Sequence, residues 1–231
     1  MLQIENLTKY YGDYQALKGI NLTVEPGEVF CLLGQNGAGK STTINLALGF
    51  LSPSSGQVLV NGVEVKPGDD RTRRMMAYIP EVVMLYGKLT AIENLDYFSR
   101  LAGFRYGRKE LEALLLEADL QEGAFDRYVG SFSKGMRQKV GIAIAVAKNA
   151  GVLLMDEPTS GLDPRATEEF SLLVRQLSQR GKAILIATHD IFNAVSIATR
   201  IGIMRSGELL HVQPASEVSA ESLLKLYLET V

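Results

Sequence analysis

The sequence predicts an α/β protein built around a parallel sheet. The apolar runs in GVLLMDEP and KAILIATHD have the length of buried strands, and Asp163 as N-cap with Pro164 in the first turn indicates a helix between them. A strand, a helix and a second strand in this order imply parallel pairing. A third apolar run, VFCLL, is followed by a glycine-rich turn and by INLALGF, where a strand should become a helix.

The first third of the chain reads as strands and hairpins. The β-rich runs LQIENLT, GINLTVEPGE and GQVLVNG alternate with turn signals, among them Pro26-Gly27 and Asn61-Gly62. These short runs predict a β-rich part beside the parallel sheet.

The pattern becomes helical between about Thr90 and Asn149. It opens with a capping box, Thr90 to Glu93, and continues through LEALLLEADL. We therefore expect a helical insertion between the strands, and the final residues, ESLLKLYLETV, predict a short amphipathic helix.

The composition is that of an ordinary globular protein. The chain has 231 residues, of which 46% are hydrophobic and 22% charged, and its formal charge is -2, which argues against broad electrostatic capture of nucleic acid. The one cysteine, Cys31, lies in an apolar run where a small buried hydrophobe is expected, and it cannot form a disulfide within the chain, which favours the cytosol. No apolar run approaches the roughly 20 residues that span a bilayer, and the N-terminus lacks a signal-peptide pattern.

The glycine-rich turn, GQNGAGKST, carries the pattern G-x-x-x-x-G-K-[ST] of a phosphate-binding loop, between a strand and a helix as that loop requires. Glycines let successive N–H groups point into one concavity, and the helix N-terminus adds positive potential. Lys40 can reach the terminal phosphates, Ser41 can ligate Mg²⁺ and Thr42 can assist. The alternative is a turn that only joins a strand to a helix. The predicted phosphate-binding residues are Gly34, Gln35, Asn36, Gly37, Ala38, Gly39, Lys40, Ser41 and Thr42.

Two acids follow the apolar run of VLLMDEP. Asp156 at the end of a buried strand can position Mg²⁺, and Glu157 can polarise a water for in-line attack on a γ-phosphate. An Asp-Glu pair that only caps the following turn is the alternative. The phosphate loop upstream favours the magnesium and water roles.

Several motifs occur in the order found in the nucleotide-binding domain of ATP-binding cassette transporters, and they extend over nearly the whole chain. SFSKGMRQ, residues 131–138, resembles the signature loop of that family, and DEPTSGLDP follows at the usual distance with Walker B and the D-loop. The signature segment is the specific part of the resemblance, because other phosphate-loop ATPases also carry Walker A and Walker B. The resemblance implies a P-loop NTPase core with a parallel sheet, an antiparallel β subdomain and an α-helical subdomain.

The implied organisation is one ATP-binding cassette domain over residues 1–231. Residues 1–81 and 150–216 should form the core and the β subdomain. Residues 82–149 should form the helical subdomain and residues 217–231 the C-terminal helix.

The resemblance also assigns contacts with ATP. Tyr11 resembles the aromatic residue that stacks on adenine, with Tyr10 as the competing candidate and a merely packed tyrosine as the alternative. His189, at a strand end, resembles the switch histidine that contacts the γ-phosphate. Glu81 stands where a glutamine usually meets Mg²⁺ or its water. The predicted metal ligands are thus Ser41, Glu81 and Asp156, and the predicted catalytic residues are Lys40, Glu157 and His189.

The signature segment can offer a second phosphate-facing helix end. Ser133 can cap the helix through KGMRQKVGIAIAVAKN and leave its N-terminal amides facing an anion. In the family such an end completes the ATP site of another subunit. This implies a head-to-tail dimer, of two copies or with a related subunit, that sandwiches two ATP molecules. The predicted residues there are Ser133, Lys134, Gly135, Met136 and Asp163.

Two segments depart from the commonest family pattern. Glu81 replaces the glutamine of the Q-loop, and the signature reads FSKGM where LSGGQ is commonest. Glu81 adds negative charge near the acidic pair, which predicts an altered magnesium dependence, and Lys134 adds positive charge where ATP phosphates should arrive. Both substitutions resemble a branch of the family that often serves exporters, and the substrate has no signal in the sequence.

The resemblance implies an ATPase at the cytoplasmic face of the cell membrane that moves a membrane-spanning partner subunit. In the family a groove beside the Q-loop receives a short helix of that partner, and Val83, Met84, Leu85 and Tyr86 would line it here. The alternative is that these residues are ordinary core.

Two rival functions differ from this one. A soluble ATPase of the same superfamily, acting in DNA repair, chromosome organisation or translation, usually carries coiled-coil, zinc-bearing or duplicated segments, and none is visible, so no nucleic-acid partner is expected. A non-catalytic nucleotide switch predicts damage to Lys40, Asp156 or Glu157, and all three residues are intact.

Overall fold

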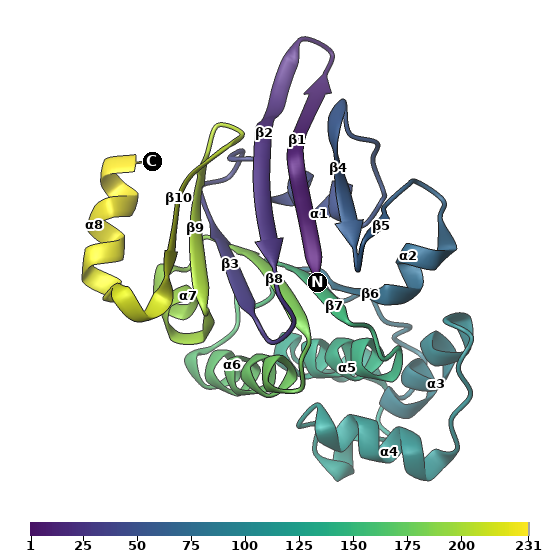
Figure 1. Cartoon of the computed structure of the whole chain (residues 1–231). Helices are drawn as coiled ribbons and strands as arrows, with labels where there is room; N and C mark the ends of the chain where they lie inside the picture. The colour runs from purple at the N-terminus through teal and green to yellow at the C-terminus, as the bar shows by residue number, and fades with distance from the viewer. Residues whose placement is uncertain (231) are drawn as a thin grey trace.

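Two sheets of different kinds form the framework in the computed structural model, which describes residues 1–230 (Figure 1). The antiparallel sheet has the order β2-β1-β4-β5, and in the second sheet, ordered β10-β9-β3-β8-β7-β6, neighbours from β9 to β6 are parallel and β10 is antiparallel. The predicted α/β fold with a parallel core sheet and an antiparallel β part is confirmed. The strands are β1 (Leu2–Tyr11), β2 (Tyr14–Val24), β3 (Val29–Leu33), β4 (Ser55–Val60), β5 (Val63–Glu64), β6 (Met76–Ile79), β7 (Val152–Asp156), β8 (Ala183–Thr188), β9 (Arg200–Arg205) and β10 (Glu208–Pro214).

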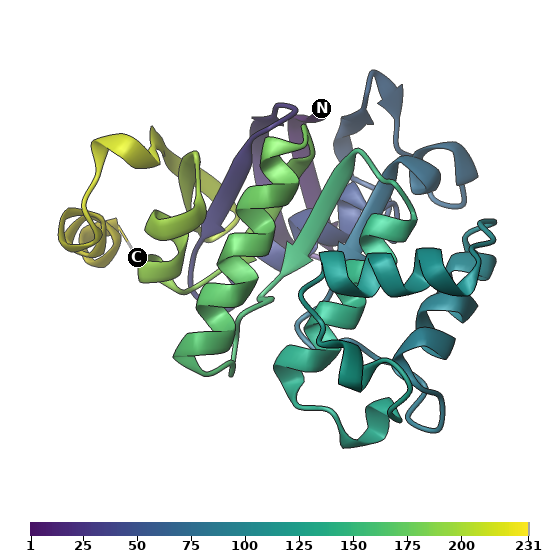
Figure 2. The same cartoon turned by 90° about the horizontal axis from the view of Figure 1, so that it is seen from below.

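Helices α1 to α7 lie in connections between these strands, and α8 follows the last strand. In both views α3 and α4 lie at one end of the molecule and α8 at the other (Figures 1 and 2). Three of the helices, α3, α4 and α5, fall within the segment 82–149 for which a helical subdomain is predicted. The helices are α1 (Lys40–Ala47), α2 (Asp70–Met75), α3 (Ala91–Leu101), α4 (Arg108–Glu117), α5 (Lys134–Ala147), α6 (Pro164–Gln179), α7 (Ile191–Ile197) and α8 (Ala220–Thr230).

The parallel sheet is buried on both faces, as its continuous apolar runs require. In β3, Phe30 and Leu32 pack into a cluster with the antiparallel sheet and α1. The alternate residues Cys31 and Leu33 pack into the other cluster, which contains residues of α5, α6 and α7. Because side chains alternate across a strand, one five-residue run serves both cores and fixes the position of the loop that follows it.

The predicted helix starts are capped by side chains that accept hydrogen bonds from free backbone N–H groups. Thr90 Oγ1 accepts the N–H of Glu93 at 3.2 Å, and the Glu93 carboxylate accepts the N–H of Thr90 at 2.7 Å. Asp163 caps α6 by accepting the N–H of Ala166 at 2.9 Å, with Pro164 as first helical residue. These two caps confirm helix starts expected from sequence.

Other elements escaped the sequence-based prediction. Helices α2 and α7 and the strands β6, β9 and β10 had no prediction. The C-terminal segment begins with a 3-10 turn, Ala215–Glu217, and its helix starts at Ala220 where 217 was expected. The last position of that predicted segment, Val231, lies outside the described residues.

Cys31 has no exposed surface, as expected of a small buried hydrophobe. Burial raises the pKa of its thiol, and the charge of Asp190 adds to the rise. The thiol therefore stays protonated at neutral pH. Among residues 1–230, no helix combines the length and the apolar character that crossing a bilayer requires.

Candidate functional site

The glycine-rich loop joins β3 to α1 and can close only because two of its residues lack a side chain. A Cβ on Gly34 would lie 2.5 Å from the carbonyl oxygen of Met204. Gly39, with φ of 110°, would bring a Cβ to 2.7 Å from the side chain of Met204. Gly39 is also the N-cap of α1, so the loop leads directly into the free amides of a helix N-terminus.

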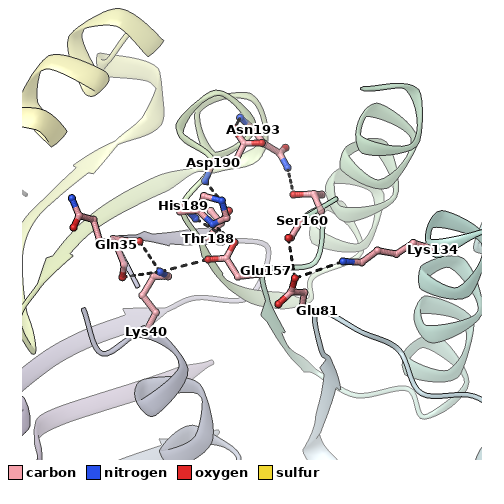
Figure 3. Close-up of polar contacts among 12 residues, drawn as sticks. Gln35, Lys40, Glu81, Lys134, Glu157, Ser160, Thr188, His189, Asp190 and Asn193 are labelled. Carbon is pink, nitrogen blue, oxygen red and sulfur yellow. Dashed lines mark hydrogen bonds and ion pairs between the residues drawn. The ribbon is translucent and has the colours of Figure 1, made fainter. Parts of the chain in front are cut away.

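Lys40 is buried against this loop, with 5% of its surface exposed. Its Nζ donates to the carbonyl oxygens of Gly34 at 2.6 Å and Gln35 at 3.2 Å. The same Nζ lies 3.5 Å from Oε1 of Glu157 (Figure 3). The cation is thus held in the mouth of the loop, where it also faces a catalytic candidate.

Glu157 is held in a conformation that few residues other than glycine adopt. Its φ is 47°, its N–H donates to the carbonyl oxygen of Ala187 at 2.8 Å, and Nδ1 of His189 lies 2.8 Å from its Oε2 (Figure 3). Because a carboxylate only accepts, Nδ1 carries the proton in this contact. The backbone strain places the carboxylate between Lys40 and His189, as is common for residues that do chemistry.

Two buried oxygens of the acidic pair have lone pairs that no hydrogen bond uses within the described residues. Oδ1 of Asp156 and Oε1 of Glu157 are buried and accept no hydrogen bond from residues 1–230. Burial raises the pKa of Asp156, and the charges of Glu157 and Glu81 raise it further, whereas the Ser41 hydroxyl and Lys40 oppose the rise. A buried carboxylate oxygen with spare lone pairs fits a divalent cation.

The donor set suits Mg²⁺ at a phosphate. No cluster of three His, Cys, Asp or Glu side chains that could hold a metal occurs within the described part of the chain. Mg²⁺ is commonly held by one or two carboxylates together with waters and phosphate oxygens, so a full protein cage is not required.

A cavity of about 530 Å³ opens beside the loop. It gathers eleven of the predicted residues and adds Tyr14, Ala16, Tyr78, Pro80 and Val82, which had no prediction. Tyr10 is not among its lining residues, whereas Tyr14 faces it from the strand opposite Tyr11. Gly34 and Ala38 are buried in the loop behind the cavity. The predicted residues that line it are Tyr11, Gln35, Asn36, Gly37, Gly39, Lys40, Ser41, Thr42, Glu81, Asp156 and Glu157.

Glu81 reaches from this cavity toward the signature helix. Its Oε1 accepts the hydroxyl of Ser160 at 2.9 Å and lies 3.7 Å from Nζ of Lys134 (Figure 3). Glu81 and Lys134, one residue from each segment that departs from the family pattern, therefore form an ion pair, which the sequence did not reveal.

The other signature residues lie elsewhere. Ser133, Gly135, Met136 and Asp163 line a second cavity of about 480 Å³ between α5, α6 and the loop after α4. Ser133 caps α5 by accepting the N–H of Met136 at 3.3 Å, as expected. The structure thus separates the predicted residues into a phosphate-loop group and a signature group.

Tyr14 and Gln138 are two of the side chains of this region that sequence reasoning missed. Tyr14 could have been predicted, because it is an aromatic residue that lies opposite Tyr11 across a short turn. Gln138 had no such signal, because its partners are backbone carbonyl groups of segments distant in the sequence.

Comparisons with known proteins agree with this geometry. A family model described as ABC transporter matches residues 17–160. The chain is 34% identical over 224 residues to the probable multidrug ABC transporter ATP-binding protein YbhF of Escherichia coli (strain K12), covering 96% of the chain but only 38% of YbhF. It is 35% identical over 214 residues to the linearmycin resistance ATP-binding protein LnrL of Bacillus subtilis (strain 168), covering 92% of the chain and 68% of LnrL.

A solved structure resembles this chain over nearly its whole length. This is the dimeric post-hydrolysis state of the ATP-binding cassette MJ0796 bound to ADP and Pi, with a TM-score of 0.82, 29% identity, and coverage of 93% of this chain and 99% of that one.

Proposed function

The chain belongs to the ABC transporter family, and we propose that it binds and hydrolyses ATP to drive transport through a separate membrane-spanning subunit. One observation carries the proposal. Lys40 in the mouth of the phosphate loop, the strained Glu157 and His189 form one chain of polar contacts beside Asp156, whose buried Oδ1 accepts no hydrogen bond from the described residues. A structural cap would not need this arrangement, whereas in-line attack on a γ-phosphate needs each part of it.

Each side chain has a role in that reaction. Lys40 would exchange its loop carbonyls for the β- and γ-phosphate oxygens and neutralise charge that develops there. Glu157 would accept a proton from the attacking water, and His189 would hold that carboxylate in position and contact the γ-phosphate. Ser41, Asp156 and Glu81 would hold Mg²⁺, which supplies charge neutralisation on the phosphates.

The signature group supports assembly into a dimer. Ser133, Gly135 and Asp163 line a cavity that is separate from the phosphate loop, and the structurally similar cassette MJ0796 is a dimer. We therefore infer a head-to-tail pair, of two copies or with a related subunit, in which each signature helix end completes the other subunit's ATP site.

The partner would dock beside Glu81. A cavity of about 240 Å³ lies there between the strand end of β6, α3 and α5, lined by Tyr78, Val83, Met84, Leu85 and Phe98 among others. A helical subdomain over residues 82–149, between Glu81 and the signature, would transmit the nucleotide state to that groove. The ATPase would act at the cytoplasmic face of the membrane.

Export is the proposed direction of transport. YbhF and LnrL carry multidrug-transporter and resistance names, which also favours transport over a role in DNA repair or translation.

The test has two arms. The purified chain should hydrolyse ATP in a magnesium-dependent reaction, and a tagged chain expressed in its own host should co-purify with an integral membrane protein from detergent-solubilised membranes. Absence of turnover with and without that partner would reject the enzyme. Turnover together with recovery on DNA or ribosomes would reject only the transporter.

A further inference from the structure

Gln138 is a buried side chain of the signature helix for which nucleotide binding gives no explanation. It is 1% exposed. Its Nε2 donates to the carbonyl oxygens of Pro158 at 2.9 Å, Glu81 at 3.2 Å and Pro80 at 3.3 Å, and its Oε1 has no hydrogen-bond partner within residues 1–230. The side-chain amide thus acts only as a hydrogen-bond donor, and all three of its acceptors are backbone carbonyl groups.

The three acceptors belong to two segments beside the phosphate-loop cavity. Pro158 follows Glu157 at the end of β7, and Pro80 and Glu81 follow the end of β6. Gln138 itself belongs to α5, whose first residues line the signature cavity. One side chain therefore joins the strand end that carries the proposed base, the loop that carries Glu81, and the signature helix.

The turn at Glu157 needs a restraint of this kind. A left-handed φ is unfavourable for a residue with a Cβ and persists only where the surroundings fix it. The N–H of Glu157 is held by the carbonyl oxygen of Ala187, and the carbonyl of the next residue, Pro158, is held by Gln138. These two bonds flank Glu157 and keep its carboxylate aimed at Lys40 and His189.

A second contact fixes α5 against the same loop. Gly141 lies one turn beyond Gln138, and a Cβ at that position would be 3.0 Å from Cγ2 of Val83. The helix can approach the segment after Glu81 this closely because Gly141 presents no side chain. The amide of Gln138 and the flat surface of Gly141 thus act on adjacent parts of one interface.

Resting on the ATPase function proposed above, we propose that Gln138 is a positioning residue for hydrolysis, which keeps the Glu157 turn, the Glu81 loop and the signature helix in register without touching nucleotide. Glu157 and Glu81 face the chain's own nucleotide, whereas the signature helix would face that of the second subunit. The same amide therefore makes the two sites of a dimer respond to each other.

Two substitutions of Gln138 separate its hydrogen bonds from its shape. Gln138→Met keeps the length and removes the donors, and Gln138→Glu keeps the shape but sets a carboxylate against three carbonyl oxygens. Each should lower kcat about 10- to 100-fold, because a displacement of about 1 Å at the reacting groups has a cost of that size. The Kd for ATP, from a fluorescent-nucleotide titration, should change less than about threefold because the phosphate loop is untouched, and the Hill coefficient for ATP should fall toward one.

Asn94→Leu is the matched control. Asn94 is also a buried amide, and its Nδ2 donates to the carbonyl oxygens of Tyr86, Leu89 and Thr90, away from Glu157. Asn94→Leu should lower the midpoint of thermal unfolding about as much as Gln138→Met does. It should nevertheless leave kcat near the wild-type value. Equal kcat losses in both variants, or kcat within about threefold of wild type in Gln138→Met, would overturn the proposal.

Gly141→Ala gives a second measurement if the Gln138 variants do not fold. Alanine favours the helix, so this variant should stay folded while its methyl group presses on Val83. It should lower kcat with little change in the Kd for ATP, and an unchanged kcat would overturn the proposal. A wild-type chain without ATP turnover would instead reject the function proposed above.

Discussion

Glu81 and Lys134 form an ion pair within one subunit, with Oε1 and Nζ 3.7 Å apart. The Glu81 side chain is 52% exposed and that of Lys134 32%, and exposed pairs contribute only about 0–1 kcal/mol. Such a pair opens when either member gains a stronger partner. Mg²⁺ for Glu81 and a nucleotide phosphate for Lys134 would be stronger partners, so the pair should compete with both.

Substitutions of the two residues should therefore move the magnesium requirement in opposite directions. Glu81→Gln removes a ligand and should raise the Mg²⁺ concentration for half-maximal hydrolysis about three- to tenfold. Lys134→Gln removes a competing cation and should lower it. The control is Glu64→Gln, an exposed carboxylate on β5 paired with Lys66. An unchanged magnesium titration in Glu81→Gln would place that residue outside the metal shell.

Replacement of Lys40 should abolish ATP-dependent behaviour and leave the fold intact. Its Nζ contacts loop carbonyls and Glu157, not the core, so Lys40→Ala should still unfold cooperatively. Contacts to charged phosphates are worth about 1.5–3 kcal/mol, which predicts ATP binding weaker by about 10- to 150-fold. Calorimetric titration with ATP measures this, and near-normal affinity and turnover would contradict the assignment.

Glu157→Gln should separate binding from chemistry. The amide keeps the shape of the side chain but cannot accept the proton of water, so hydrolysis should slow by about 100-fold or more. ATP should still bind, and the protein should accumulate as an ATP-bound dimer in light scattering. Monomer alone in saturating Mg-ATP would count against both the dimer and this role. The double variant with Lys40→Ala should stay monomeric and serves as the control.

The adenine contact can be assigned by three single substitutions. Tyr11 and Tyr14 line the phosphate-loop cavity and Tyr10 does not. Stacking of a base on an aromatic ring is worth about 1–3 kcal/mol, so Tyr11→Ala and Tyr14→Ala should each weaken ATP binding about 5- to 150-fold. Tyr10→Ala should leave the Kd unchanged. A loss confined to Tyr10→Ala would reverse the assignment.

The docking groove can be tested at Met84, which lines it, and at Tyr86, which follows Leu85 and was predicted to line the groove but is not among its lining residues. Met84 is 79% exposed and Tyr86 51%, whereas Val83 and Leu85 pack partly on the core. Met84→Glu with Tyr86→Glu should keep ATP binding and abolish co-purification with the membrane subunit, because charges replace apolar contact surface. Leu228→Glu, on exposed α8, is the control and should still co-purify. Full recovery of the partner by the Met84 and Tyr86 variant would exclude this surface.

Local chemistry explains which elements could be predicted. The phosphate loop, the caps at Thr90, Ser133 and Asp163, and the buried runs of β3, β7 and β8 are encoded within a few adjacent residues each. Such short-range rules do not depend on the rest of the fold.

The missed features depend on tertiary contacts. β6 is only four residues long and forms because β7 pairs with it, and the Ser160, Lys134 and Gln138 contacts of Glu81 join segments 53 to 79 residues apart. The left-handed φ of Glu157 likewise has no local signal, since glutamate rarely adopts it. The sequence thus predicted the residue types of the site and not the bonds that aim them.

The burial of Cys31 makes the chain ready for site-specific labelling. The sequence holds no other cysteine, and this one has no exposed surface and a thiol that stays protonated. A maleimide or a thiol-reactive spin label would react with a cysteine introduced at the surface, whereas the native thiol would not react. Pairs of probes on α4 and α6 could therefore follow the movement of the helices during turnover without first removing a core residue.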